Sequence, residues 1–137
     1  MEKRKELTLN EYQQKAMTTC MPSSENFSYM FLNLVGEVGE FASKVAKAIR
    51  KEKVVIGWNE AAMEADENNL FPVCSYNAWK EMEEELKKEA GDIMWQMFGV
   101  FSVMGWDANE IGWGNLDKLA GRKAAGTIDG DGDGIIR

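Results

Sequence analysis

The sequence predicts an all-α protein, folded as a four-helix bundle. Apolar residues recur at steps of three and four along most of the chain, which is the period of an amphipathic helix. The alternation of apolar and polar residues that marks a half-buried strand is almost absent. Both prolines, Pro22 and Pro72, fall between periodic segments and so leave the expected helices unbroken.

The first and last helices are expected to begin at capping boxes, in which the side chains of the first and fourth residues bond each other's backbone N–H. TLNE starts the first helix at Thr8, and the pattern continues to about Cys20. DANE starts the last helix at Asp107, and the pattern continues to about Leu119. These are the two shorter helices of the predicted bundle.

Two longer helices are expected in the middle of the chain. One extends from about residue 24 to 51, and the other from residue 75 or 76 to 104, where Gly105 offers a natural end. The second half of the latter, IMWQMFGVFSVM, is apolar on nearly every side, so we expect it at the centre of the core.

The length of 137 residues predicts a single domain over residues 1–137. Residues 53–75 lack a regular pattern and are expected to form an irregular insertion. The Gly- and Asp-rich residues 123–137 are expected to form a flexible tail.

Composition excludes several functions. The net charge of −7 argues against a nucleic acid polymer as partner, because proteins bind its phosphate backbone through basic side chains. The absence of histidine excludes a His-based triad and a His-ligated zinc site. The longest apolar run, residues 93–106, is shorter than the about 20 residues of a bilayer span, and the first residues lack the apolar core of a signal peptide. We therefore expect a cytoplasmic protein without a membrane partner.

Two pairs of acidic residues lie where the long helices become apolar: Glu37 with Glu40, and Glu89 with Asp92. A spacing of three places both members of each pair on one helix face. Carboxylates gathered at a core boundary repel one another unless a cation compensates them. A site made only of carboxylate oxygens favours Mg²⁺, with Mn²⁺ as a possible substitute.

The alternative is that each pair belongs to a solvated helix face, as such pairs usually do. Lys87 and Lys88 lie close enough in sequence to Glu89 and Asp92 to neutralise them. Spacing alone leaves both interpretations open.

Two further residues near the acids have alternative roles. Lys44 follows Glu40 by one turn, where it can bind a phosphate or form an ordinary ion pair with Glu40. Trp95 follows Asp92 by three residues, where it can stack on a nucleobase or pack in the core.

Three segments in order carry a family resemblance. LVGEVGEF at residues 34–41 and KKEAGDIMWQM at residues 87–97 fit a G-E-x-G-E motif and an E-x-x-D motif, and GNLDKLAGR at residues 114–122 fits N-x-x-K-L-x-x-R. Together they resemble the MazG-like members of the all-α nucleoside triphosphate pyrophosphohydrolases. The resemblance covers most of the chain, but the long 53–75 insertion leaves the preferred substrate open.

The resemblance implies a Mg²⁺-dependent enzyme that hydrolyses a nucleoside or deoxynucleoside triphosphate to the monophosphate and pyrophosphate. It implies that the metal ligands are Glu37, Glu40, Glu89 and Asp92. It also implies that a carboxylate, Glu37 or Glu40, accepts the proton of the attacking water. The residues that it places at the phosphates are Asn115, Lys118 and Arg122.

The sequence is compatible with two functional classes. In the first, the chain is the nucleotide-hydrolysing enzyme just described, and the four acids must converge. In the second, it is a non-catalytic helical dimerisation or adaptor module, which has no reason to bring the acids together. The apolar faces of the long helices favour a homodimer or a dimer of dimers in either case.

Overall fold

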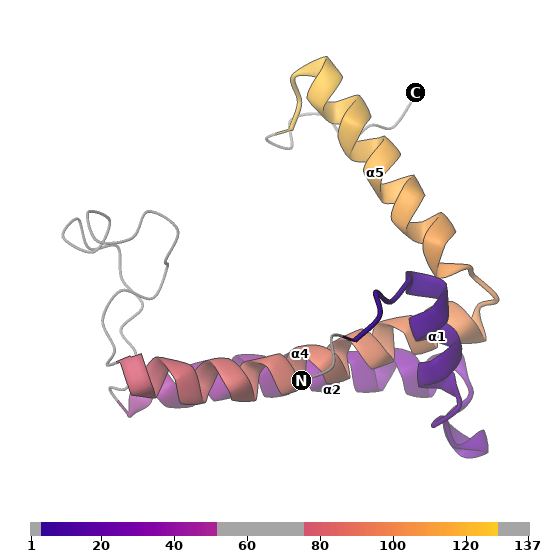
Figure 1. The fold of residues 1–137 in the computed structure, drawn as a ribbon. Coiled ribbons are helices and arrows are strands. Elements are labelled where there is room, and N and C mark those ends of the chain that lie inside the picture. The colour runs from indigo at the N-terminus through magenta and orange to yellow at the C-terminus, as the bar shows by residue number, and fades with distance from the viewer. Residues whose placement is uncertain (1–3, 52–75, 129–137) are drawn as a thin grey trace. The chain divides into compact units, whose positions relative to one another are not determined.

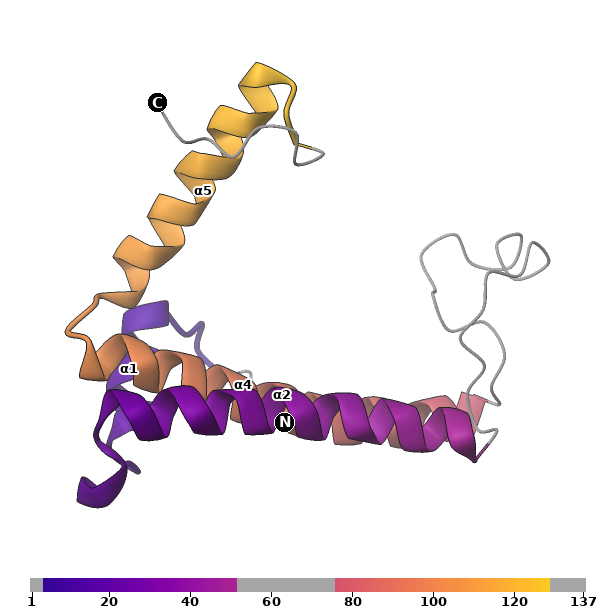
Figure 2. The ribbon, with the colours of Figure 1, turned by 180° about the vertical axis from the view of Figure 1, so that it is seen from behind.

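The computed structural model describes residues 4–51 and 76–128 (Figures 1 and 2). These residues form four α-helices and a short 3₁₀ turn at Pro22–Ser24, and no strand occurs among them. The helices are α1 (Leu9–Met17), α2 (Phe27–Arg50), α4 (Tyr76–Val103) and α5 (Ala108–Ala125). The predicted all-α class is confirmed. None of these helices has both the length and the apolar character that a bilayer span needs.

The helix bounds differ from the predicted ones mainly at their ends. Helix α1 ends at Met17, three residues before Cys20. Helix α5 continues through Ala125, beyond the predicted end at Leu119, and Gly126 caps it in the left-handed conformation at φ 70°. Gly105 has the same φ of 70° and follows the end of α4, as predicted. The predicted insertion at residues 53–75 lies outside the described residues, as does most of the predicted tail.

The chain divides into two compact units. One consists of Ser28–Met97 and contains α2 with most of α4. The other consists of the chain up to Phe27 together with the chain from Phe98 onward, and so contains α1, the end of α4 and α5.

In the first unit, α2 and α4 run side by side in opposite directions (Figures 1 and 2). The Nζ atom of Lys44 on α2 joins the pair, because it lies 3.1 Å from Glu89 Oε1 and 3.8 Å from Glu85 Oε2 on α4. Met30, Ala48 and Met82 are buried between other side chains. Many large apolar side chains remain exposed on the outer side of α2: Phe31, Leu32, Val35, Val38 and Ile49.

The predicted central position of the apolar half of α4 is only partly right. Phe98 and Val100 are buried, but Met94 and Met97 remain 38% and 39% exposed. The described helices therefore cover one side of this segment and leave another side open.

The second unit is a corner in which α1 holds the start of α5. The Thr8 capping box is present in full, with Glu11 N–H donating to Thr8 Oγ1 and Thr8 N–H donating to Glu11 Oε2. The Tyr12 ring meets the Phe98 ring edge to face, with 4.9 Å between centroids. The side chain of Gln13 makes three hydrogen bonds: it donates to Ser102 Oγ and to the carbonyl of Trp106, and it accepts from the N–H of Ala108.

The N-terminus of α5 is capped from two directions. Asp107 Oδ1 accepts from the N–H of Glu110, which is one of the two bonds of the predicted capping box. Asn10 of α1 adds two bonds, donating from Nδ2 to Asp107 Oδ2 at 2.7 Å and accepting at Oδ1 from the N–H of Asn109. Side chains of α1 thus satisfy backbone donors that the first turn of any helix leaves unpaired.

Candidate metal centre

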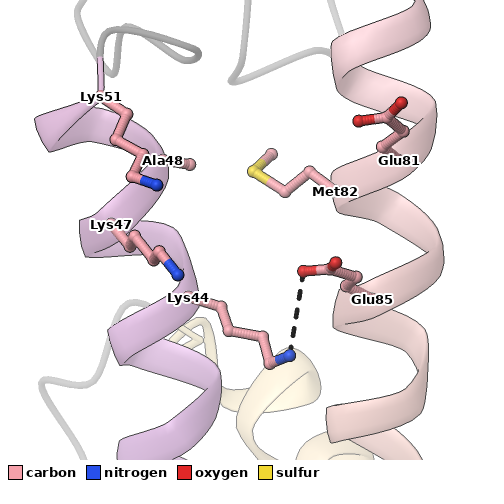
Figure 3. Close-up of a pocket in the computed structure, with 7 residues that line it drawn as sticks. All are labelled: Lys44, Lys47, Ala48, Lys51, Glu81, Met82 and Glu85. Atoms are coloured by element: carbon pink, nitrogen blue, oxygen red, sulfur yellow. Dashed lines mark ion pairs between the residues drawn. The ribbon is translucent and has the colours of Figure 1, made fainter.

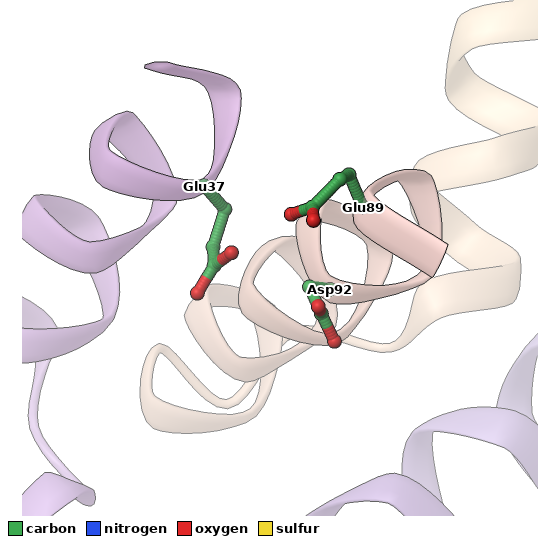
Figure 4. Close-up of side chains that lie close together, drawn as sticks. All are labelled: Glu37, Glu89 and Asp92. Carbon is green, nitrogen blue, oxygen red and sulfur yellow. The ribbon is translucent and has the colours of Figure 1, made fainter. Parts of the chain in front are cut away.

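Three of the four predicted acids converge between α2 and α4. One carboxylate oxygen each from Glu37, Glu89 and Asp92 lies within 4.8 Å of the other two. Figure 4 shows Glu37 on α2 facing Glu89 and Asp92 on α4. Oxygens that share one Mg²⁺ lie about 2.1 Å from it and hence at most about 4.2 Å apart, so small side-chain rotations would suffice for a common cation. We call these three residues the acidic cluster.

Glu89 is the deepest member of the acidic cluster, with only 8% of its surface exposed. Its Oε1 is paired with Lys44, but its Oε2 is buried and has no hydrogen-bond partner. A buried carboxylate oxygen without a partner is costly. This atom is therefore the place in the cluster where a cation would be stabilised most.

The surroundings of Glu37 disfavour the charged form of its carboxyl group. Burial, followed by the charges of Glu40, Asp92 and Glu89, raises the pKa of Glu37 above its usual 4.5. A hydrogen bond from Asn33 Nδ2, 3.4 Å from Glu37 Oε1, opposes the rise. A positive ion among these carboxylates would remove the repulsion and lower that pKa.

Glu40 stands apart from the acidic cluster. It is exposed one turn after Glu37, and it is not among the three residues whose oxygens converge. Its charge still contributes to the raised pKa of Glu37. Its predicted roles as metal ligand and proton acceptor stay predictions.

The ion pairs differ from those that the sequence suggested. Lys44 pairs across helices with Glu89 and Glu85, and not with Glu40 on its own helix. Its pKa is raised, mainly by the hydrogen bond to Glu89. Lys87 pairs with Glu83 and Glu84 on its own helix, so it does not neutralise Glu89. Lys44 is thus paired with Glu89, the most buried member of the acidic cluster.

A basic groove lies on the other side of Lys44 from the acidic cluster. Its volume is about 290 Å³, and Met82 and Ala48 form its buried apolar part. Figure 3 shows the lysines on α2 facing the glutamates on α4 across it, with Lys44 paired to Glu85. The charged residues that line it are Lys44, Lys47, Lys51, Glu81 and Glu85.

The remaining predicted site residues lie on two elements. Trp95 is half-buried on α4, one turn from Asp92. On α5, Asn115 and Lys118 are exposed and Arg122 is half-buried. Spacings of three and four place these α5 residues on one face of that helix. They belong to the corner unit, so their part in the site stays a prediction.

The glycines beside Glu37 are not required by contacts within the described chain. A Cβ at Gly39 would have no heavy atom within 4 Å, and one at Gly36 would meet only Asn33 Oδ1, at an ordinary 3.8 Å. Both positions are exposed. An alanine side chain at either position would meet no close neighbour in the described chain.

Gln96 was not singled out from the sequence, yet it is, with Glu89, one of the two buried polar residues among the described side chains of α4. It is 4% exposed, and its Oε1 has no hydrogen-bond partner. A signal was present: Gln96 is the one amide within the apolar run IMWQMFGV. A polar side chain inside such a run is a candidate for a role other than packing.

The arrangement can bind a divalent cation with carboxylate oxygens and present it beside an open surface and a row of lysines. That combination suits a ligand that carries several phosphate groups, because such a ligand brings both a chelator for the cation and charge for the lysines.

Comparison with known proteins agrees with this chemistry. A family model described as the MazG nucleotide pyrophosphohydrolase domain matches residues 25–126, which include all of α2, α4 and α5. The Gene 37 protein of Mycobacterium phage L5 is 32% identical over 111 residues, which make up 81% of this chain and 78% of that protein. No solved structure matches the chain.

Proposed function

The chain belongs to the MazG nucleotide pyrophosphohydrolase family, and we propose that it hydrolyses nucleoside or deoxynucleoside triphosphates to the monophosphate and pyrophosphate in a Mg²⁺-dependent reaction. The observation that carries the proposal is the convergence of Glu37, Glu89 and Asp92 from two helices. An adaptor module would gain nothing from bringing three carboxylates together, and repulsion would cost it stability.

The chemistry of the acidic cluster fits Mg²⁺. Its three side chains offer only oxygen, which is the ligand type that Mg²⁺ and Mn²⁺ prefer. The orphaned Oε2 of Glu89 supplies a buried acceptor that nothing in the described chain satisfies. In this proposal Glu37, Glu89 and Asp92 hold the cation, with Glu40 completing the set from the next turn of α2.

A bound Mg²⁺ would supply charge neutralisation for the phosphates and a lower pKa for water. The chain's own residues then bind and orient the nucleotide and move the proton. Either Glu37 or Glu40 accepts the proton of the water that attacks the phosphorus.

Other residues bind the nucleotide in this proposal. Lys44 exchanges its pairing with Glu89 for a phosphate oxygen once the cation balances the acids. Asn115, Lys118 and Arg122 bind the remaining phosphate oxygens from α5, and the half-buried Trp95 stacks on the base.

We further propose that the active form is a homodimer or a dimer of dimers. Exposed apolar side chains on α2 support this, as do those on α5: Ile111, Trp113, Leu116 and Leu119. Light scattering at micromolar concentration is expected to give at least twice the mass of one chain. A monomer at that concentration would contradict this part of the proposal.

The decisive test of function is a screen of pyrophosphate release from the ribo- and deoxyribonucleoside triphosphates. Release is expected with Mg²⁺ or Mn²⁺ and is expected to stop when EDTA is added. The monophosphate should appear in equal amount, because one α–β bond is broken for each pyrophosphate formed. Release of single phosphates, or no release from any of the nucleotides, would refute the proposal.

A further inference from the structure

We propose that Gln96 is a positioning residue of the candidate metal centre, and that its side-chain oxygen accepts a hydrogen bond from a water molecule of the hydrated cation. This inference rests on the proposed function, since it assumes that the acidic cluster binds a divalent cation. It adds a neutral amide to a site that otherwise consists of carboxylates.

Gln96 lies on the same face of α4 as two members of the acidic cluster. Glu89, Asp92 and Gln96 follow one another at steps of three and four, so they share one face of the helix. Side chains on a helix lean toward its N-terminus, over the preceding turn. The Gln96 side chain therefore leans toward the turn that carries Asp92.

Gln96 is deeply buried, and its hydrogen bonding is incomplete. Its side chain is 4% exposed, and Oε1 is buried without a hydrogen-bond partner. Natural proteins pair nearly all buried polar atoms, so an unpaired one in this place needs a reason. Oε1 is an acceptor only, and what it lacks is a donor.

A hydrated cation bound in the acidic cluster would supply this donor to Gln96 Oε1. Mg²⁺ usually keeps several of its waters when it binds to carboxylates, and each such water is a strong hydrogen-bond donor. Two buried acceptor atoms among the described residues of this face have no partner, Glu89 Oε2 and Gln96 Oε1. A cation with its waters would satisfy both at once.

The first test measures cation affinity without substrate. Isothermal titration with Mg²⁺, and electron paramagnetic resonance with Mn²⁺, would compare the unmodified chain with Gln96→Met and Gln96→Leu. We expect both variants to bind each cation about 10-fold more weakly, the usual loss when an outer partner of a metal site is removed. Gln96→Glu keeps an acceptor oxygen and is expected to restore the affinity.

A control separates this effect from a general effect of the exchange. Gln14→Met makes the same change at an exposed position of α1 and should leave the affinity unchanged. A purely structural role of Gln96 would alter the unfolding temperature of the variants but not the cation affinity of the folded protein. An affinity within twofold of the unmodified chain in both Gln96→Met and Gln96→Leu would overturn the proposal.

A second measurement uses the unmodified chain, so it does not depend on the folding of any variant. The side-chain amide signals of Gln96 in a ¹⁵N-labelled sample should shift during a Mg²⁺ titration, with the same midpoint as the backbone signal of Asp92. If the Asp92 signal moves and the Gln96 signal does not, the proposal fails while the metal site stands. If neither moves, the metal site itself fails, and with it the proposed function.

Discussion

Two buried or half-buried glutamines in this chain are treated in opposite ways. Gln13, in the corner of α1 and α5, uses its amide completely, donating to Ser102 and Trp106 and accepting from Ala108. Gln96, one turn after Asp92 on α4, is more deeply buried and leaves its oxygen without a partner. The side chains of the corner satisfy one another by hydrogen bonds, whereas the candidate metal centre contains a buried acceptor that no described residue satisfies.

Hydrogen-bond satisfaction thus separates Gln13, which has a structural role, from Gln96, to which the proposal above gives a role at the cation. The same contrast holds for acids. Glu11 in the corner has a lowered pKa, mainly because a backbone N–H of Thr8 bonds to it. Glu37 in the acidic cluster has a raised pKa, mainly because of burial. One environment stabilises the charged carboxylate, and the other penalises it.

The largest expected effect is the loss of pyrophosphate release when a proposed metal ligand is replaced. Asp92→Asn or Glu40→Gln is expected to lower pyrophosphate release by more than about 100-fold, because even outer partners of metal sites cost about 10–100-fold. The far-ultraviolet circular dichroism should stay unchanged, since both positions are exposed. Undiminished release by both variants would refute the assignment of the metal site.

The next largest effect is expected on the stability of the corner formed by α1 and α5. Gln13→Ala removes three hydrogen bonds and is expected to lower the free energy of unfolding by about 2 kcal/mol. Gln14→Ala, at the exposed neighbour, should change it by less than about 0.5 kcal/mol. Urea unfolding measures both. Equal stability of the two variants would show that the corner bonds contribute nothing.

A pair of glycines on α5 gives a smaller effect within the corner. Gly114→Ala is expected to raise the free energy of unfolding by about 1 kcal/mol, the usual gain in a helix interior, because nothing lies within 4 Å of the added Cβ. At Gly112 the added Cβ would lie 3.1 Å from Leu9 Cδ1, so Gly112→Ala should gain less. An equal gain at both positions would mean that α1 and α5 do not pack this closely.

The smallest effect is a difference in the pH dependence of stability, measured on metal-free protein. Above pH 4.5, an unfolded chain releases the Glu37 proton while the folded chain, with its raised pKa, retains it. The contribution of Glu37 is therefore lost as the pH rises from 4.5 through that raised pKa. Glu37→Gln should remove this loss and flatten the curve above pH 4.5.

Glu11 provides the opposite sign. Its lowered pKa gives a contribution that is present above pH 4.5 and is lost as the pH falls below it. Glu11→Gln should therefore flatten the curve on the acid side. Urea unfolding over a pH series would show the two effects. If both variants shifted the curve in the same direction, the contrast between the two carboxylates would be wrong.

Local signals in the sequence predicted the elements well. TLNE and DANE placed the starts of α1 and α5, because a cap depends on residues three apart. The long apolar periodicities predicted α2 and α4 to within about three residues at the ends where they are described. The end of α5 was missed because its last turn, RKAA, is polar and leaves no apolar period to follow.

Contacts between distant residues were not predictable in this way. No local pattern indicates that Asn10 caps a helix 97 residues later, or that Lys44 pairs with Glu89 and not with Glu40. Spacing correctly suggested that acids on two helices could meet. It did not tell which of the four would converge, since Glu40 has the same spacing as its partners and lies outside the cluster.

The hydrogen bonds from α1 to the start of α5 also have a consequence for the order of folding. They join residues that are 95 to 99 positions apart, so α1 leaves the ribosome long before its partner exists. At a synthesis rate of about 5–20 residues per second, that delay is roughly 5–20 s. The α2–α4 pairing needs no residue beyond Asp92 for its ion pairs and acidic cluster, so its parts are all available sooner. Helix α1 therefore waits for its partner α5 until after the residues of the α2–α4 pairing have been made.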